Sequence, residues 1–307
     1  MGLVSKAGAE RLRKEVQAQR FSLVTSGREQ DLREGIVAHF NALHSLSFWP
    51  DREIEQQLLD DEQKDVDALD GDIGLTEGVV MFSPSSASKC PRELFFKATK
   101  AKKDDITMFP YQKRWTRNST AVHRAVQKDL LYAEKVLTNP LFTVERTEDG
   151  RPAWERNIAH VVQFEHNGVR FQMYGMMDGI LRYTPDGSRI GFEFKTKSTT
   201  IAAVGDFKMR EPSQDHVTQC TAYSLLFGID EYLITYESVA KDGWMKGADA
   251  RADMKSFYIR VTDDDRNALL DKFAFVAENF YNGEIPDPDF SKCIFCPYKT
   301  RCKEATA

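Results

Sequence analysis

The chain has 307 residues, which is enough for one large domain or two smaller ones with a sizeable core. Hydrophobic residues make up 41% and charged residues 29%, and no stretch resembles a secretory signal or the roughly 18 apolar residues of a membrane span. We therefore expect a protein of the cytoplasm, or of the host cytoplasm if the chain is viral, with no membrane partner. The net charge of −5 argues mildly against nucleic-acid binding, although phosphate contacts need only a local basic patch.

The first 58 residues are predicted to be helical, because their apolar residues recur every three or four positions. The segment from Asp60 to Gly74 is acidic and has few large apolar side chains. Such a segment is typical of a linker or an exposed boundary. We therefore predict a helical N-terminal extension over residues 1–80 and a main domain over residues 81–307.

The main domain alternates between helical and extended patterns. Its order of helix, paired strands, helix, strands and helix predicts an α/β fold, with a mixed sheet flanked by helices in the α+β manner. In chain order we predict a helix start at residues 83–86, helices over 90–100 and 117–136, an extended region over 159–183, a turn at 185–188, a strand over 189–197, a helix over 216–227 ended by Gly228, strands over 231–237 and 255–261, a helix over 263–282, and a loop from Pro286.

The turn at residues 185–188 defines a hairpin that gathers charged side chains. With the turn at its tip, Asp178 lies opposite Lys195, and Glu193 lies opposite Ile180, one diagonal step from Asp178. All of these residues share one face, because facing residues do so and side chains alternate along a strand. The other face is left to alternate phenylalanines, which we expect to point toward a core.

Two acidic side chains at this separation can lean onto one divalent cation, which prefers oxygen ligands. Lys195 beside them can polarise an attacking water or balance developing phosphate charge. These are the parts that metal-assisted phosphodiester hydrolysis needs. A surface hairpin with a salt bridge between Glu193 and Lys195 explains the same residues, and one β-bulge would shift the register.

Two helices carry further polar candidates. Gln219 and Tyr223 are four residues apart, on the same helix face as His216. His123 lies beside an apolar stripe, where a histidine is either structural or, as a neutral imidazole, a cation ligand. Partly buried amphipathic helices with incidental polar groups remain the alternative.

Basic residues cluster in two places, which are either solvated helix faces or phosphate contacts. From these clusters we select Arg92, Lys97 and Arg117 as candidate contacts. The first cluster is Arg92, Lys97, Lys100, Lys102 and Lys103, and the second is Lys113, Arg114 and Arg117.

Five cysteines in a chain with no export signal argue against a disulfide framework. Cys293, Cys296 and Cys302 have the C-x2-C-x5-C spacing of residues that share one metal centre, and Cys90 is the natural fourth ligand. Zinc and a four-iron cluster both accept four thiolates, and spacing does not separate them. Cys220 is predicted to be a small buried hydrophobic residue.

Taken together, these motifs resemble the RecB-like branch of the PD-(D/E)XK nucleases, over roughly residues 82–303. The closest resemblance is to its iron–sulfur members, such as the AddB nuclease domain and the CRISPR-associated exonucleases of the Cas-four type. Six motifs follow the family order: FSPSSASKCPRELFF around Cys90, STAVHRAVQ around His123, the G-x-x-D of Gly175 to Asp178, the D/E-x-K of Glu193 to Lys195, the Q-x-x-x-Y of Gln219 to Tyr223, and the terminal cysteines.

The resemblance implies a PD-(D/E)XK restriction-endonuclease-like core and a set of roles. His123, Asp178, Glu193 and the Phe194 carbonyl would bind Mg²⁺ or Mn²⁺. Lys195 would assist catalysis, while Gln219 and Tyr223 would shape the site and touch DNA. Cys90, Cys293, Cys296 and Cys302 would hold a four-iron, four-sulfur (4Fe–4S) cluster.

The function implied is that of an exonuclease on DNA ends, single-stranded by preference, in recombination, repair or end processing. A structure-specific endonuclease is one alternative, and a catalytically idle iron–sulfur subunit that binds DNA or acts as a scaffold is another. No G-x-x-x-x-G-K-S/T phosphate loop occurs in the sequence. We therefore expect a free-standing nuclease, or one that works with a helicase or recombination protein.

Overall fold

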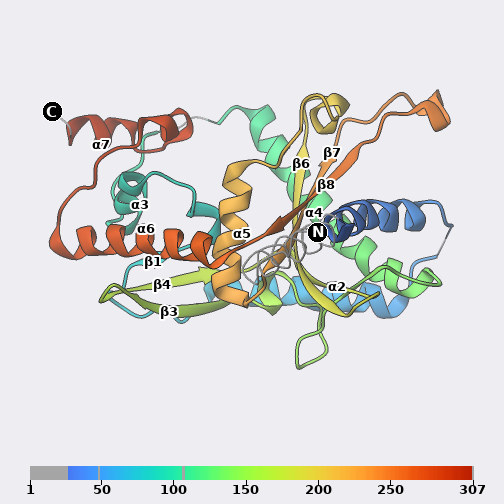
Figure 1. Ribbon diagram of the computed structural model, residues 1–307, viewed down its shortest axis with the longest axis horizontal. Coiled ribbons are helices and arrows are strands. Elements are labelled where there is room, and N and C mark those ends of the chain that lie inside the picture. Colours follow the sequence, from blue (N-terminus) through green and yellow to red (C-terminus); the bar gives the residue numbers. More distant parts are fainter. Residues whose placement is uncertain (1–26, 48, 106–107, 306–307) are drawn as a thin grey trace, which may run out of the picture.

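The computed structural model describes residues 27–47, 49–105 and 108–305 (Figure 1). Its main sheet has five strands in the order β2-β5-β6-β7-β8, in which β6 and β7 are parallel and the other neighbours are antiparallel. The predicted mixed sheet flanked by helices is confirmed. The strands are β2 (Phe142–Val144), β5 (Gly179–Tyr183), β6 (Ser188–Lys197), β7 (Glu231–Ser238) and β8 (Met254–Arg260).

A second, three-stranded sheet has the order β1-β4-β3. Strands β3 (His160–His166) and β4 (Val169–Gly175) form a hairpin, and the short β1 (Met81–Phe82) runs parallel to β4. The predicted extended region over residues 159–183 is therefore three strands, divided between two sheets. Its first bend is at Asn167 and Gly168, whose positive φ angles of 52° and 76° are typical of a two-residue type I′ turn.

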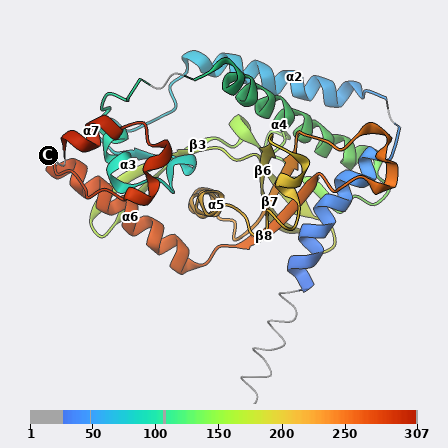
Figure 2. The ribbon, with the colours of Figure 1, turned by 90° about the horizontal axis from the view of Figure 1, so that it is seen from above.

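The described helices lie around these sheets. Figure 2 shows α2 and α4 side by side, with α3, α6 and α7 gathered at one end of the molecule. The helices are residues 27–44, α2 (Arg52–Asp67), α3 (Pro91–Ala98), α4 (Pro110–Val136), α5 (Gln214–Phe227), α6 (Asp263–Asn282) and α7 (Lys299–Glu304). Among the described residues, no helix has the length and apolar character needed to cross a membrane.

The helix of residues 27–44 packs into the core of the main sheet. Its apolar residues at three-to-four spacing are fully buried in the same cluster as Phe192 and Phe194 of β6. Each buried side chain of this size contributes roughly 1.5–3 kcal/mol to stability. The expected helix over residues 1–26 lies outside the described residues. The buried positions are Leu32, Ile36, Phe40 and Leu43.

The prediction of a linker from Asp60 to Gly74 is wrong for residues 60–67, which complete α2. Three acidic side chains there, Asp61, Glu62 and Asp65, have partners on the main domain. Asp61 accepts hydrogen bonds from the Trp154 indole and the Asn157 amide, both at 2.9 Å. Most side chains of residues 60–67 are nonetheless exposed, in keeping with the alternative of an exposed boundary. Composition alone does not reveal which acidic residues meet a donor.

Other element boundaries also differ from the predictions. Helix α4 begins at Pro110 and not at Arg117, since a proline fits the first helical position. The tail after Pro286 contains the 3₁₀ helix η6 (Phe290–Phe295) and α7. The short strands β1 and β2 have no periodicity to mark them, and pairing with longer strands defines them.

The hairpin of β5 and β6 has a longer turn than predicted. Tyr183 pairs with Ser188, so residues 184–187 form a four-residue loop, and Ile180 pairs with Gly191 and not with Glu193. The register is therefore shifted by two residues. Because side chains alternate with a period of two, the shift leaves every predicted face unchanged.

Candidate active site

Asp178 lies at the entry to β5 and is held by both α4 and β6. Its Oδ2 accepts the Phe194 N–H at 2.7 Å and lies 3.6 Å from His123 Nδ1. The Gln127 side chain donates to the Asp178 backbone carbonyl at 3.1 Å. Burial lowers the pKa of His123, but the Asp178 carboxylate raises it more, so the net direction is upward.

Gly175 explains how the strand leading to Asp178 can pack closely. A Cβ at this position would lie 2.6 Å from Leu226 of α5 and 2.8 Å from Pro84 of the 3₁₀ helix η2 (Pro84–Ser86). Only glycine allows both elements to approach β4 this closely. The glycine of the G-x-x-D motif therefore has a packing role.

Glu193 lies in the middle of β6 and is fully buried, with 0% exposure. Lys195 Nζ contacts its Oε1 as an ion pair, yet among the described residues neither carboxylate oxygen has a hydrogen bond of good geometry. Burial raises the pKa of Glu193 to about 8, the Asp178 charge adds to this, and Lys195 opposes it. A buried carboxylate with so little compensation is costly, and such groups are concentrated at functional sites.

The hairpin brings the two predicted carboxylates together. Gly179 pairs with Phe192, and Asp178 and Glu193 each lie one residue beyond that pair, so they come face to face. Burial lowers the pKa of Lys195, but the charges of Glu193 and Asp178 raise it more, so the ammonium stays protonated. The surface salt bridge considered for Glu193 and Lys195 is thus a buried ion pair.

Helix α5 covers this site from the other side. Gln219 Nε2 donates to Tyr223 Oη at 2.7 Å, as their four-residue spacing allows. Burial raises the pKa of Tyr223, and the nearby Glu193 and Asp178 carboxylates raise it further. His216, in contrast, bonds to Tyr236 of β7 at 2.7 Å and does not join Gln219.

A family model described as the PD-(D/E)XK nuclease superfamily matches residues 93–303. The chain belongs to this superfamily. No curated protein matches the sequence.

Three solved structures are similar to this nuclease in the arrangement of their elements. The protein SSO0001 is 16% identical, with a TM-score of 0.42 over 82% of this chain and 94% of that one. An alkaline exonuclease from Laribacter hongkongensis is 11% identical, with a TM-score of 0.40 over 74% and 95%. A phage-related exonuclease from Haemophilus somnus is 12% identical, with a TM-score of 0.36 over 67% and 95%. At these values the likeness supports no argument about activity.

The candidate active site has a further acidic neighbour, Glu155, that sequence patterns did not indicate. It begins the 3₁₀ helix η3 (Glu155–Asn157), and its N–H donates to the Met177 carbonyl at 2.8 Å. Its φ of 42° is strained for a residue other than glycine. Burial raises the pKa of Glu155 to about 7, and the charge of Asp178 contributes next. Neither the strained backbone of Glu155 nor its proximity to Asp178 can be recognised from a sequence pattern.

The fit of the site to a divalent cation rests on its chemistry. The buried carboxylate oxygens of Glu193 and the neighbouring Asp178 are hard oxygen donors, which Mg²⁺ and Mn²⁺ prefer. Their present partners are His123 and Lys195. As arranged, no group of three or more His, Cys, Asp or Glu side chains within the described residues converges as a metal site. The donor set fits the cation, and the side chains would have to turn toward it.

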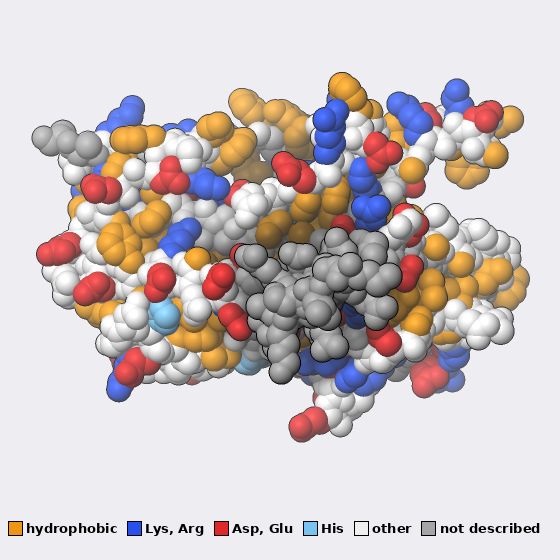
Figure 3. Space-filling view, in the orientation of Figure 1, with side chains coloured by type: hydrophobic (Ala, Val, Ile, Leu, Met, Phe, Trp, Pro, Cys, Tyr) orange, Lys and Arg blue, Asp and Glu red, His pale blue; other side chains and the backbone are white. Residues whose placement is uncertain are grey.

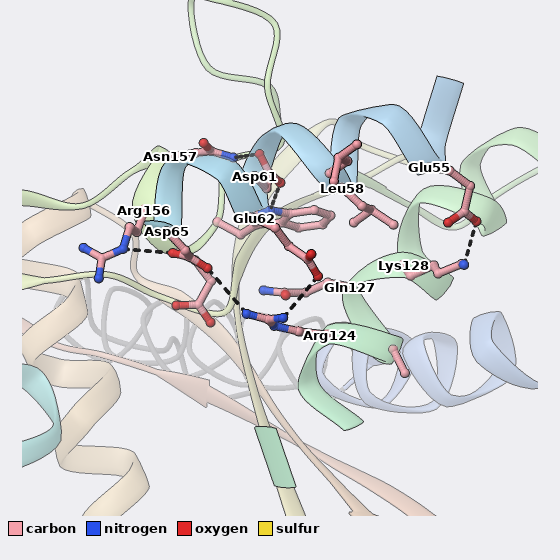
Figure 4. Close-up of a pocket in the computed structure, with 14 residues that line it drawn as sticks. Glu55, Leu58, Asp61, Glu62, Asp65, Arg124, Gln127, Lys128, Arg156 and Asn157 are labelled. Atoms are coloured by element: carbon pink, nitrogen blue, oxygen red, sulfur yellow. Dashed lines mark hydrogen bonds and ion pairs between the residues drawn. The ribbon is translucent and has the colours of Figure 1, made fainter. Parts of the chain in front are cut away.

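A cavity of about 390 Å³ lies beside the site, between α2, α4 and η3. Figure 4 shows Arg124 reaching from α4 toward Glu62 and Asp65 of α2, at 3.1 and 3.7 Å. Its lining residues include five acidic and three basic side chains, so it does not favour phosphate. Glu155 and Gln127 line this cavity and also neighbour Asp178 of the candidate site. We regard it as a packing groove that joins α2 to the main domain.

The candidate DNA contacts differ in accessibility. Arg92 is 5% exposed, and its guanidinium bonds the Pro286 carbonyl, so its prediction as a phosphate contact is wrong. Tyr223 is 3% exposed and shapes the site without reaching solvent as a DNA contact would. Lys97 is exposed and bonds Ser83 Oγ at 3.2 Å, and Arg117 is exposed on α4. On the face in Figure 3, acidic and basic side chains are interspersed, so any DNA contact there is local.

The four cysteines expected to act together line one cavity of about 550 Å³, between α3, η6 and α7. The Asp289 N–H donates to Cys90 Sγ at 3.1 Å, and Arg92 Nη1 lies 3.6 Å from Cys302 Sγ. These donors orient and polarise two of the sulfurs. Cys220, in contrast, is fully buried in α5, as expected of a small hydrophobic residue.

Proposed function

We propose that this chain is a metal-dependent DNA exonuclease that hydrolyses phosphodiester bonds from single-stranded ends. The observation that carries the proposal is Glu193, whose fully buried carboxylate has no well-formed hydrogen bond among the described residues and lies beside Lys195 and Asp178. Membership in a nuclease superfamily supports the same chemistry. Exonuclease action, strand preference and use in recombination, repair or end processing are parts of the proposal.

The residues that would hold Mg²⁺ or Mn²⁺ are Asp178 and Glu193, with His123 and the Phe194 carbonyl. When bound, such a cation lowers the pKa of a water molecule and neutralises phosphate charge. Lys195, whose raised pKa keeps it protonated, would stabilise the negative charge that develops on the scissile phosphate.

The surrounding side chains would orient this machinery. The Phe194 N–H fixes Asp178 Oδ2, and Gln127 holds the same residue by its backbone. On the opposite side, the bonded pair of Gln219 and Tyr223 closes the site against water. Such preorganisation reduces the reorganisation needed during the reaction.

We also propose that Cys90, Cys293, Cys296 and Cys302 hold a 4Fe–4S cluster, with zinc as the alternative. The support is that all four line one cavity and that two sulfurs already receive N–H donors. The centre would join α3 to the C-terminal segment. Iron content and visible absorbance after purification without oxygen test this, and a colourless protein with one zinc per chain would select the alternative.

Such an enzyme would act in the cytoplasm, alone or with a helicase or recombination protein. To test the nuclease proposal, the protein is incubated with end-labelled linear and with closed circular single-stranded DNA, with Mn²⁺ and with chelator. Glu193→Gln is the test variant, and Glu165→Gln, at an exposed glutamate of β3, is the matched control. We expect only linear DNA to be degraded, and only by the parent and the control.

Other outcomes would change the proposal. Cutting of closed circles would show an endonuclease that uses the same site. If a folded, cluster-loaded sample cuts neither substrate and still binds DNA, the chain is an idle binding or scaffold subunit, and the nuclease proposal fails.

A further inference from the structure

We propose that the exposed aromatic residues at the start of α4, namely Phe109, Tyr111 and Trp115, form a stacking platform that guides single-stranded DNA to the nuclease site. This inference rests on the proposed function and adds to it a binding surface and a substrate class. The proposal rests on the position of these side chains along helix α4.

Side chains spaced four residues apart along α4 form a ridge that turns gradually around the helix, and they pass from exposed at its outer end to buried at the site. At the inner end, His123 lies 3.6 Å from Asp178, and Gln127 bonds the Asp178 carbonyl. Four residues outward, Ser119 Oγ lies 2.8 Å from Thr196 Oγ1, next to Lys195. Residues four apart are neighbours on a helix surface. The next two members of this ridge are Trp115 and Tyr111.

The outer end of the ridge is aromatic and exposed. Phe109 is 58% exposed, and Tyr111 and Trp115 are each 48% exposed. The rings of Phe109 and Tyr111 lie nearly parallel, at 9° and 6.1 Å between centroids, and Tyr111 meets Trp115 edge-on at 5.5 Å. Aromatic side chains exposed together in this way offer faces on which unpaired bases stack, whatever the base.

Among the described residues, the positive charges next to these rings have no acidic partner. Within the described residues, Lys113 and Arg114 form no ion pair, and Arg117 bonds only the uncharged amide oxygen of Asn118. The exposed acidic residues elsewhere on α4 and α2 are, by contrast, often paired. Uncompensated cations beside exposed aromatic rings are complementary to a nucleic-acid single strand, which has both phosphates and free base faces.

The position also suits a strand that ends in the active site. Trp115 and His123 are eight residues apart, which is about 12 Å along the helix, or roughly three to four nucleotides at the B-form rise. Helix α4 packs against β6, the strand that carries Glu193 and Lys195, and its Ser119 reaches Thr196 there. A duplex offers no base faces to such a platform, so the occupant we propose is single-stranded.

The experiment measures binding without cleavage. A fluorescein-labelled 12-nucleotide oligo(dT) and a duplex of equal length are titrated with the full chain in chelator, and anisotropy is recorded. The variants are Tyr111→Ala, Trp115→Ala and the conservative Trp115→Phe. Phe275→Ala, at an equally exposed aromatic residue of α6, is the matched control.

Each alanine variant of the platform is expected to weaken single-strand binding about fivefold or more, and to leave duplex binding unchanged. Trp115→Phe and the control should bind like the parent. Lys113→Ala and Arg114→Ala should each reduce the slope of log affinity against log salt by about one.

Single-strand affinity that is unchanged in Tyr111→Ala and Trp115→Ala overturns the platform, and so does an equal loss for single strand and duplex. Failure of the proposed function is seen separately, as a parent protein that binds oligo(dT) through Trp115 and degrades nothing when Mn²⁺ is added.

Discussion

Two acidic regions border helix α4, and their carboxylates have different environments. In the cavity beside α2, Glu62 and Asp65 are partly exposed and each pairs with an arginine at 3.1 and 2.9 Å. In the nuclease site, Glu193 is fully buried without a well-formed hydrogen bond, and Glu155 is held at a strained φ of 42°. The first region stabilises the packing of α2, whereas the second retains free acceptor capacity of the kind that a cation uses.

The largest effect is expected at Glu193. Glu193→Gln keeps the shape of the side chain and removes the charge, so nuclease activity should fall at least about 100-fold. In chelator the stability should change little, because the lower cost of burying an uncharged amide is offset by the loss of the ion pair with Lys195. Degradation of linear DNA and thermal unfolding measure the two effects, with Glu62→Gln as the control from the α2 cavity. Full activity of Glu193→Gln would show that the buried carboxylate is no more important for catalysis than the carboxylates of the α2 cavity.

The next effect comes from a buried group that belongs to neither region. His39, which is 2% exposed, lies against the Phe40 and Phe142 rings, and among the described residues its two ring nitrogens have no partner. Burial lowers the pKa of His39 from 6.5 to about 4. The neutral form is favoured in the folded state, so its stability contribution is complete above pH 6.5 and is lost as pH falls toward 4.

The loss at His39 corresponds to about 3 kcal/mol of unfolding free energy between these pH values. Denaturant unfolding across this range should show a steeper acid loss for the parent than for His39→Leu. The variant should keep full nuclease activity at neutral pH, because the site residues lie elsewhere. A fall in the activity of the variant would contradict this, because it would give His39 a role in catalysis that we assign to the acidic site alone.

Glu155 gives two smaller effects that can be separated. Glu155→Gln should reduce activity roughly tenfold by weakening the negative field beside Asp178. Glu155→Gly should lose the same activity and unfold at a higher temperature, since relief of a left-handed conformation is worth about 1 kcal/mol. Equal stability of the two variants would show that the φ of 42° carries no strain.

The smallest effect is expected in the α2 cavity. Asp65→Asn removes ion pairs to Arg156 and Arg124, which are partly exposed, so stability should change by about 0–1 kcal/mol. Activity should equal that of the parent. A loss of activity would place the α2 cavity in the nuclease site.

Local pattern predicted much of the fold because neighbouring residues determine it. The helices that became α4, α5 and α6 follow from apolar spacing, and Gly228 ends α5 at a positive φ of 63° as a C-cap glycine does. The alternation along β6 placed Phe192 and Phe194 in the core and Glu193 on the other face. The predicted register of β5 and β6 was wrong by two residues, but every side chain was still assigned to the correct face, because the alternation has a period of two.

The sequence by itself determined the mixed fold, the face of β6 that carries charge, and the set of residue types that an acidic metal site needs. Only the tertiary structure decided that α5 buries Glu193, that α2 packs against the main domain, that Arg92 is internal, and that Glu155 joins Asp178. These features depend on contacts between segments far apart in the chain. Burial and backbone strain arise from such contacts, so no local pattern records them.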